Sequence, residues 1–252
     1  FEKNFNQSAA WKWMAENRHK SLIFAAVYLI VVFGIQHFMK ERGAYHLRAP
    51  LTLWSFSLTT LSVIAAWRIW KPIVFLLLTK GFKQSVCSQS LYVHPVSKLW
   101  VYLFALSKLL ELGDTVFIVL RKKKLIFVHW YHHLTAVVVA WYVYSCMMPG
   151  FAWVAAWNFS IHGLTYSYYT VTAMGIRVPT SIAMIITTSQ MVQMTGFVIV
   201  NIFLFYWRDD KNCNFMWPAF CLTSWVYTSL LVLFCNFFFK TYLSSTWKSK
   251  GE

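Results

Sequence analysis

The chain has 252 residues, of which 58% are hydrophobic, 19% aromatic and 12% charged, and its mean hydropathy is +0.51. Soluble domains average about 45–50% apolar and about 25% charged residues, so this composition indicates a membrane protein and excludes a water-soluble enzyme, a disordered tail and a collagen-like chain. The net charge of +15, in so apolar a chain, indicates anionic lipid or a polyanionic substrate such as a phosphorylated cofactor, and we expect no nucleic-acid partner.

Seven windows along the chain contain the roughly 20 apolar residues that a spanning helix requires. The run Pro72–Thr79 is too short to cross a bilayer, and we interpret it as an interfacial or re-entrant piece. The connections are short and no internal repeat is found, so we predict one all-α polytopic membrane domain over residues 1–252. The predicted spans lie near Ser21–Met39, Leu51–Ile69, Val96–Leu120, Leu125–Cys146, Phe151–Met174, Pro179–Trp207 and Phe215–Tyr242.

The third window carries the only two acidic residues inside the predicted spans, Glu111 and Asp114. A charge at the bilayer centre costs roughly 2.5–3.5 kcal/mol on insertion scales, so such residues indicate an internal cavity. Lys108, Glu111 and Thr115 share one helix face at this spacing. A Lys–Glu pair that only joins helices is the alternative interpretation.

The fourth window carries three histidines at spacing i, i+3 and i+4, which places all three imidazoles on one helix face. The next two windows add polar stripes at helical spacing. Four consecutive helices therefore present polar faces to a shared interior, and we predict a bundle with a buried polar chamber. The residues are His129, His132 and His133, then Asn158, His162, Tyr166 and Tyr169, then Thr187, Gln190 and Gln193.

A box of this form first suggests the di-iron centre of membrane desaturases and hydroxylases. Such sites need several histidine boxes, but apart from His37 at the end of the first span only four histidines fall inside the predicted spans and no second box occurs, so we expect no metal site. Nucleophilic catalysis fits better, because imidazole attacks thioesters and an acyl-imidazole stays activated for transfer. Cys146 is discounted as a nucleophile, because it lies fourteen residues beyond His132, about 21 Å along the same helix.

The orientation of the chain is predicted from its two ends, because basic residues are balanced between the two sides. The sequon Asn6-Gln7-Ser8 is usable only in the lumen, and Lys248 and Lys250 resemble a dilysine retrieval signal of the endoplasmic reticulum, which is read in the cytosol. We therefore predict an endoplasmic-reticulum membrane protein with a lumenal N-terminus and a cytosolic C-terminus. Cys87 and Cys213 are then both lumenal. They could form a disulfide or stay as two free thiols, and the sequence does not decide between these alternatives.

Four motifs occur in the order and spacing of a known family. They resemble the signatures of the ELO fatty-acid elongases, and the resemblance covers nearly the whole chain, including Phe1-Glu-Lys and Lys83-Gln-Ser-Val-Cys87. The motif His129-Trp-Tyr-His-His133 and the Glu-Leu-Gly-Asp-Thr sequence at residues 111–115 look like those of the family branch that acts on saturated and monounsaturated acyl-CoA of palmitoyl type. Thr165, where the family usually has Met, departs from the pattern and bears on chain-length preference. The motifs are Lys108-Leu-Leu-Glu-Leu-Gly-Asp-Thr115, His129-Trp-Tyr-His-His133, Asn158-Phe-Ser-Ile-His-Gly-Leu-Thr-Tyr-Ser-Tyr-Tyr169 and Thr187-Thr-Ser-Gln-Met-Val-Gln193.

The resemblance implies condensation of a long-chain acyl-CoA with malonyl-CoA, giving 3-oxoacyl-CoA, carbon dioxide and CoA, with the acyl chain in an apolar tunnel whose closed end sets product length. We predict that His132 attacks the thioester and that His162 orients or activates the attacking group. His129 and His133 would donate hydrogen bonds to developing oxyanions, and Asp114 or Glu111 would fix an imidazole tautomer.

Other residues are expected to contact the substrates. The basic run Arg121–Lys124 fits either an ordinary cytosolic loop or a direct CoA contact. The candidates for the CoA phosphates are Arg177, Lys240 and Lys248, and the remaining substrate-binding candidates are Lys108, Thr115, Asn158, Tyr166, Tyr168, Tyr169, Gln190 and Gln193.

A seven-span receptor and a lipid transporter remain as non-enzymatic alternatives. No Gly-rich nucleotide fingerprint follows a strand, so we expect no reductase activity and no cofactor. The partners implied are then the lipid bilayer and the enzymes that complete the cycle: a 3-oxoacyl-CoA reductase, a 3-hydroxyacyl-CoA dehydratase and an enoyl-CoA reductase. A homodimer stays open.

Overall fold

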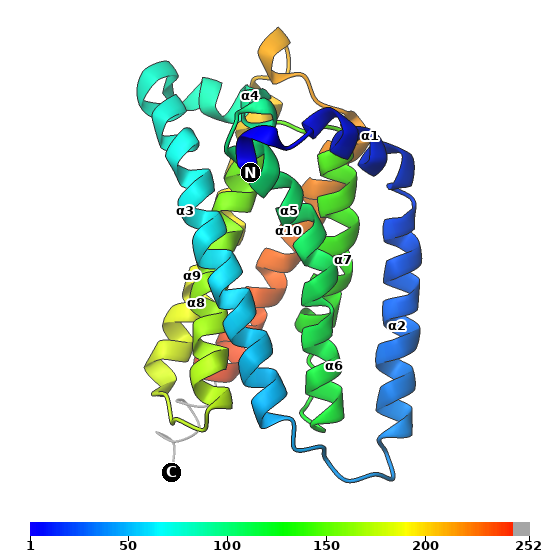
Figure 1. Ribbon diagram of the computed structural model, residues 1–252. Coiled ribbons are helices and arrows are strands. Elements are labelled where there is room, and N and C mark those ends of the chain that lie inside the picture. The colour runs from blue at the N-terminus through cyan, green and yellow to red at the C-terminus, as the bar shows by residue number, and fades with distance from the viewer. Residues whose placement is uncertain (244–252) are drawn as a thin grey trace.

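The computed structural model describes residues 1–243, and this part of the chain is all helical, without a strand (Figure 1). The predicted all-α class is therefore confirmed. The helices of the bundle are α2 (Lys20–Phe38), α3 (Arg48–Cys87), α5 (Ser97–Glu111), α6 (Gly113–Leu120), α7 (Phe127–Ser145), α8 (Phe151–Ala173), α9 (Thr180–Tyr206) and α10 (Trp217–Phe238). The other elements are η1 (Glu2–Asn4), α1 (Gln7–Asn17), α4 (Ser90–Val93), η2 (Lys211–Cys213) and η3 (Phe239–Leu243).

Four helices within the described residues are long and apolar enough to cross a membrane. The third predicted span is divided into α5 and α6, each shorter than a crossing. α7 and α8 are 19 and 23 residues long but carry the histidines and tyrosines that lower their hydropathy. Membrane character is thus clear, whereas length and composition do not establish seven spans. The four are Lys20–Phe38, Arg48–Cys87, Thr180–Tyr206 and Trp217–Leu243.

The interpretation of Pro72–Thr79 as a separate interfacial piece was wrong, because α3 continues through it as one helix. Helical geometry is interrupted only at Gly81, with φ 80° and ψ 171°. Proline inside a helix removes a hydrogen bond and costs about 3 kcal/mol. Here Pro72, Ile73 and Leu76 are all buried, so packing of this segment offsets that cost.

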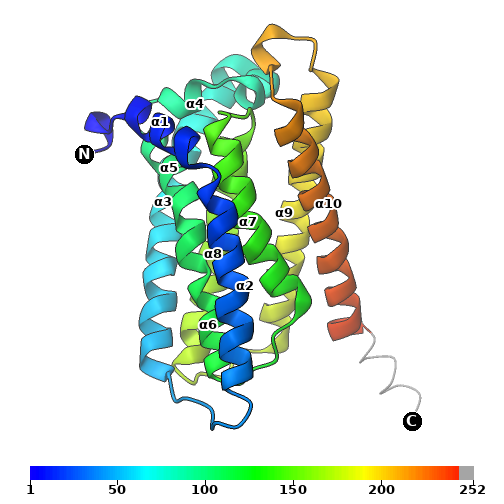
Figure 2. The same ribbon diagram turned by 90° about the vertical axis from the view of Figure 1, so that its right-hand side faces the viewer.

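The bundle is organised by pairs of neighbouring helices. α3 runs along α8, α9 lies beside α10, and α2 packs on α6 and α7 (Figures 1 and 2). Gly196 allows α9 to approach α8 closely, because a Cβ there would lie only 1.8 Å from a ring atom of Trp157. The core between these helices consists mainly of valine and other aliphatic residues, aromatic residues and alanine.

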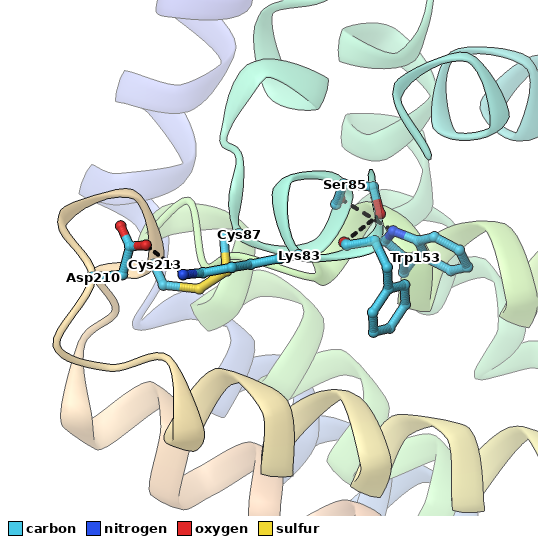
Figure 3. The surroundings of a disulfide bond; sticks show 7 residues. Lys83, Ser85, Cys87, Trp153, Asp210 and Cys213 are labelled. Carbon is cyan, nitrogen blue, oxygen red and sulfur yellow. Dashed lines mark hydrogen bonds and ion pairs between the residues drawn. A yellow bond between two sulfur atoms is a disulfide. The ribbon is translucent and has the colours of Figure 1, made fainter. Parts of the chain in front are cut away.

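A disulfide between Cys87 and Cys213 joins the end of α3 to η2 (Figure 3). The open question between a bridge and two free thiols is thereby decided for the bridge. Lys83 forms an ion pair with Asp210 at 2.6 Å beside it, and the Nε1 of Trp153 donates to the carbonyl of Ser85 at 3.1 Å (Figure 3). These contacts tie three segments distant in sequence to one end of the bundle.

The N-terminal segment is fixed to the same end. Glu2 forms an ion pair with Arg68 of α3 and accepts a hydrogen bond from Trp100 of α5. The Arg68 guanidinium beside it holds the pKa of the Glu2 carboxyl below its usual value. Asn6 is exposed and caps α1 by accepting from the backbone N–H of Ala9 at 3.0 Å.

Candidate active site

Four histidines from two helices line one cavity of about 270 Å³. On α7 the ring centroids of His129 and His133 are 4.4 Å apart, and those of His132 and His133 are 5.1 Å apart. His162 of α8 faces them, with its ring centroid 6.4 Å from that of His132. The structure thus brings together all four histidines predicted to be catalytic. Within residues 1–243, no three His, Cys, Asp or Glu side chains form a group that could hold a metal ion.

A buried ion pair lies behind His162. The Nζ of Lys108 is 2.6 Å from the Oε1 of Glu111 and donates to the Oδ1 of Asn158 at 2.7 Å. The other oxygen of Glu111, Oε2, has no hydrogen-bond partner and lies 3.6 Å from the Nδ1 of His162. Glu111 is therefore placed to attract a proton on Nδ1, which would leave the Nε2 of His162 as the basic nitrogen.

Asp114 occupies a different position from Glu111, although only three residues separate them. It accepts hydrogen bonds from the Nε1 of Trp54 at 2.7 Å and the hydroxyl of Tyr166 at 2.6 Å. Its Oδ2 lies 4.0 Å from the Nε2 of His133. Each of the two predicted carboxylates thus lies near a different histidine, Glu111 near His162 and Asp114 near His133.

Thr115 is fully buried and lies behind His129, outside the cavity wall. Its hydroxyl is 2.8 Å from that of Tyr28 on α2 and 3.1 Å from the Nε2 of His129. The predicted role of Thr115 in binding substrate therefore finds no support in this geometry, in which it contacts a histidine.

The cavity reaches from the histidines to Ile126 in the α6–α7 connection and Ala183 near the start of α9. These connections lie at the end of the bundle opposite the disulfide (Figure 1). Arg177 and Lys240 are exposed at that end and do not line this cavity. Lys248 and Lys250 lie outside the described residues. Of the other predicted residues, the wall includes Tyr166, Tyr168, Tyr169, Thr187, Gln190 and Gln193.

A smaller, apolar cavity of about 50 Å³ continues from the first one toward the disulfide end. The two share His132 and Met194. The walls of the smaller cavity include Phe104, Phe151 and Tyr227, with Lys108 and Asn158 near His132. His132 therefore stands at the boundary between a polar chamber and an apolar extension.

A third cavity, of about 320 Å³, lies on the other side of Asp114, His129 and Tyr169. Arg121 and Lys123 of the basic run contribute to its wall, together with residues of α3. Two members of the basic run thus approach the histidine cluster rather than only covering the surface.

Several residues of the site were missed by the sequence analysis. Tyr28 and Trp54 contact Thr115 and Asp114. α10 supplies Phe234 and Phe237 to the cavity wall, and η3 supplies Tyr242. In the sequence each of these is one aromatic residue among many in an apolar span. The hydroxyl of Tyr28 and the indole N–H of Trp54 are the only sequence signals for these two residues, because such groups need a partner when they are buried. Residue spacing does not show which helix supplies that partner.

Ionisable groups inside a membrane protein are costly and are retained for function. Histidines and carboxylates enclosed between the helices of so apolar a chain therefore indicate an enzyme of the membrane-protein class. Residues 13–250 match the ELO: GNS1/SUR4 family, and the chain belongs to that family. The desaturase, receptor and transporter alternatives are set aside by this membership.

Curated relatives match the chain over nearly its whole length. It is 46% identical over 250 residues to very long chain fatty acid elongase 6 of Gallus gallus, covering 99% of this chain and 94% of the relative. The identity to elongase 6 of Homo sapiens is also 46%, over 249 residues and with the same coverage. Very long chain fatty acid elongase 3 of Homo sapiens is 39% identical over 232 residues, covering 92% of this chain and 86% of the relative.

Proposed function

We propose that this protein is the condensing enzyme of fatty acid elongation. It joins a long-chain saturated or monounsaturated acyl-CoA to malonyl-CoA and releases 3-oxoacyl-CoA, carbon dioxide and CoA. Membership in the ELO family and 46% identity to elongases named for very long fatty acid chains support an acyltransferase of this kind.

The observation that carries the mechanism is the position of His132 between the two cavities. An acyl chain in the apolar extension would hold its thioester beside His132, with CoA in the polar chamber. The apolar extension would then be the predicted acyl tunnel, and His132 would be the reactive group at its entrance.

In the first half-reaction a ring nitrogen of His132 attacks the thioester carbon. The carbon–nitrogen bond forms, the carbon–sulfur bond breaks, and the electron pair leaves with the CoA thiolate. The proton on the other nitrogen of His132 passes to this thiolate, directly or through His162. The product is a neutral acyl-imidazole on the enzyme and free CoA.

In the second half-reaction malonyl-CoA takes the place of CoA. Its carboxylate leaves as carbon dioxide, and the electron pair of the broken carbon–carbon bond forms the enolate of acetyl-CoA. The enolate carbon attacks the acyl carbon, and the bond to His132 breaks, leaving an imidazolate. The imidazolate takes up a proton from water, because its original proton left with CoA, so each cycle consumes one proton. Donors at His129 and His133 would stabilise the oxyanions of both steps.

We also propose seven spans in the membrane of the endoplasmic reticulum, with α5 and α6 together forming one span. The disulfide end would face the oxidising lumen, and the end with Arg121–Lys124, Arg177 and Lys240 would face the cytosol, where CoA esters are found. Asn6 would then be open to glycosylation. The reductases and the dehydratase that finish the cycle would be separate partner enzymes, and a homodimer remains an expectation.

The test uses purified full-length protein with palmitoyl-CoA and malonyl-CoA labelled at its free carboxyl carbon. Release of labelled carbon dioxide reports condensation. Acyl-CoA alone should release about one equivalent of CoA per enzyme in a burst and leave a base-labile adduct on His132.

His132→Ala should abolish the burst, and the control Cys146→Ala should retain it. Release of CoA only after malonyl-CoA is added would mean direct condensation in a ternary complex, with His132 acting as a general base. Absence of labelled carbon dioxide from the wild-type protein would contradict the condensing function itself.

A further inference from the structure

α2 lies against the outside of α6 and α7 and supplies no residue to the walls of the cavities described above. It nevertheless reaches the histidine cluster through one side chain. The hydroxyl of Tyr28 is 2.8 Å from the Oγ1 of Thr115, which is 3.1 Å from the Nε2 of His129. Tyr28 is 4% exposed and Thr115 is fully buried, so water does not compete for these hydrogen bonds.

The direction of this chain follows from counting donors and acceptors. The hydroxyl of Tyr28 has no other partner in residues 1–243, and a buried hydroxyl hydrogen without an acceptor costs about 1–3 kcal/mol. Tyr28 therefore donates to Thr115. The single hydroxyl hydrogen of Thr115 is then free to point at the Nε2 of His129, which must accept it.

An imidazole that accepts at Nε2 carries its proton on Nδ1 when it is neutral. The Nδ1 of His129 has no hydrogen-bond partner in the described chain, and it is not among the buried atoms left without one. His129 also forms part of the wall of the chamber that contains His132. The Nδ1–H group is thus accessible from a cavity lined by His129, which borders both the chamber of His132 and the third cavity.

We propose that Tyr28, acting through Thr115, is a positioning residue that holds His129 as the Nδ1–H tautomer, with this N–H presented to the oxyanion of the reacting acyl group. The inference rests on the condensing function proposed above. It assigns a role to α2, whose contacts would otherwise be only packing. The opposite tautomer of His129 would present a lone pair to the oxyanion and repel it.

The experiment measures kcat and the KM for palmitoyl-CoA of purified full-length variants by release of labelled carbon dioxide. Tyr28→Phe keeps the ring and removes the hydroxyl. We expect kcat to fall about tenfold with KM unchanged, less than the 10²–10³ that deleting an oxyanion donor itself costs, because His129 remains in place.

Three further variants separate positioning from packing. Thr115→Val should lower kcat to a similar extent, and Thr115→Ser, which restores the hydroxyl, should recover most of it. Tyr28→Phe combined with Thr115→Val should be no slower than the slower single variant, because both changes break the same hydrogen-bonded chain.

Tyr92→Phe is the matched control, since Tyr92 is 2% exposed and donates its hydroxyl to the carbonyl of Met148 at 2.9 Å, far from the histidines. It should keep the wild-type kcat per folded molecule. If Tyr28→Phe does not fold, the comparison of Thr115→Val with Thr115→Ser decides the question.

A wild-type kcat in Tyr28→Phe, or losses that multiply in the double variant, would overturn the proposal while leaving the condensing function intact. Equal losses in Tyr28→Phe and Tyr92→Phe would likewise overturn it, because they would reflect stability alone. A wild-type enzyme that releases no carbon dioxide would instead contradict the condensing function.

Discussion

Lys108 and Glu111 form a buried ion pair, so removing either charge should reduce the stability of the protein strongly. Both residues are 3% exposed, and their side chains meet at 2.6 Å. Removing one partner of a buried pair costs about 3–5 kcal/mol because the other charge stays buried without compensation, whereas replacing both by apolar groups costs far less. Glu111→Ala should therefore lower the thermal midpoint in detergent more than the double change Lys108→Met with Glu111→Leu.

The exposed pair of Lys83 and Asp210 provides the control for this prediction. The side chain of Lys83 is 48% exposed, and exposed ion pairs contribute about 0–1 kcal/mol, so Lys83→Ala should change the midpoint little. Both site variants should lose condensing activity, because each removes the carboxylate beside His162. A double variant as unstable as Glu111→Ala would contradict the account of the buried pair.

At the scale of residues, spacing predicted which side chains share a helix face but not what those faces meet. The spacing of His129, His132 and His133 was sufficient to place them together, and His162 followed from the next stripe. Thr115 lay on the same predicted face as Glu111 yet contacts Tyr28 and His129. Its partners are set by the packing of α2 on α6, which a sequence without tertiary contacts does not contain.

At the scale of elements, hydropathy located the helices but placed the end of the second span too early and missed the break inside the third. The second predicted span ended at Ile69, and Pro72–Thr79 was predicted to be a separate short piece. In the structure the Nζ of Lys71 lies 4.5 Å from the ring centroid of Trp67, and Pro72 is buried, so the helix continues. The division between α5 and α6 at Leu112 likewise leaves no trace in hydropathy.

The apolar extension between α5, α7, α8 and α10 allows a prediction about chain length. Phe104 and Phe151 line it at the disulfide end, with ring centroids 5.3 Å apart. Phe151→Val removes ring volume there and should deepen the space available to the acyl end. We expect the product distribution from mixed acyl-CoA substrates, measured by mass spectrometry, to shift toward longer chains by about two carbons, since replacing the ring by an isopropyl group removes several methylene-sized groups.

Phe159→Val is the control for loss of core volume. Phe159 is 1% exposed and also packs on Phe104, with ring centroids 5.3 Å apart, but it does not line the extension. It should reduce stability to an extent similar to Phe151→Val, by about 1–3 kcal/mol, and leave the product length unchanged. A shift of equal size in both variants would mean that the extension does not hold the acyl end.

At the scale of the whole molecule, the two ends of the bundle differ in chemistry. One end carries the disulfide, the N-terminal segment fixed by Glu2, and the exposed Asn6 (Figures 1 and 3). The opposite end carries the connection with Arg121–Lys124 (Figure 1), and residues near that end, such as Ile126 and Ala183, line the polar cavity. In the proposed orientation the disulfide end is lumenal and the opposite end is cytosolic. This orientation stays a prediction, since balanced counts of basic residues do not distinguish the two sides.

The disulfide and the orientation can be tested together. Cys87 and Cys213 are 126 residues apart, and closing a loop of that length stabilises by roughly 4–5 kcal/mol in the chain-entropy model. Non-reducing peptide mapping should recover the joined peptides. Cys87→Ala, Cys213→Ala and the double variant should lose equal thermal stability, because each breaks the same bond, whereas Cys146→Ala should lose less.

In microsomal membranes a lumenal N-terminus should be glycosylated at Asn6, and the resulting mobility shift should disappear in Ser8→Ala, which removes the sequon without touching the asparagine that caps α1. The bridge and the glycan must fall on the same side, because Asn6 and Cys87 lie at one end of the bundle (Figure 1). Two thiols that react with an alkylating reagent in the native, unreduced protein would contradict the bridge. Cleavage of the N-terminal segment by protease added outside sealed microsomes would show that this segment is cytosolic. The proposed orientation would then be wrong, and the polar cavity would lie on the lumenal side, away from the cytosolic CoA esters.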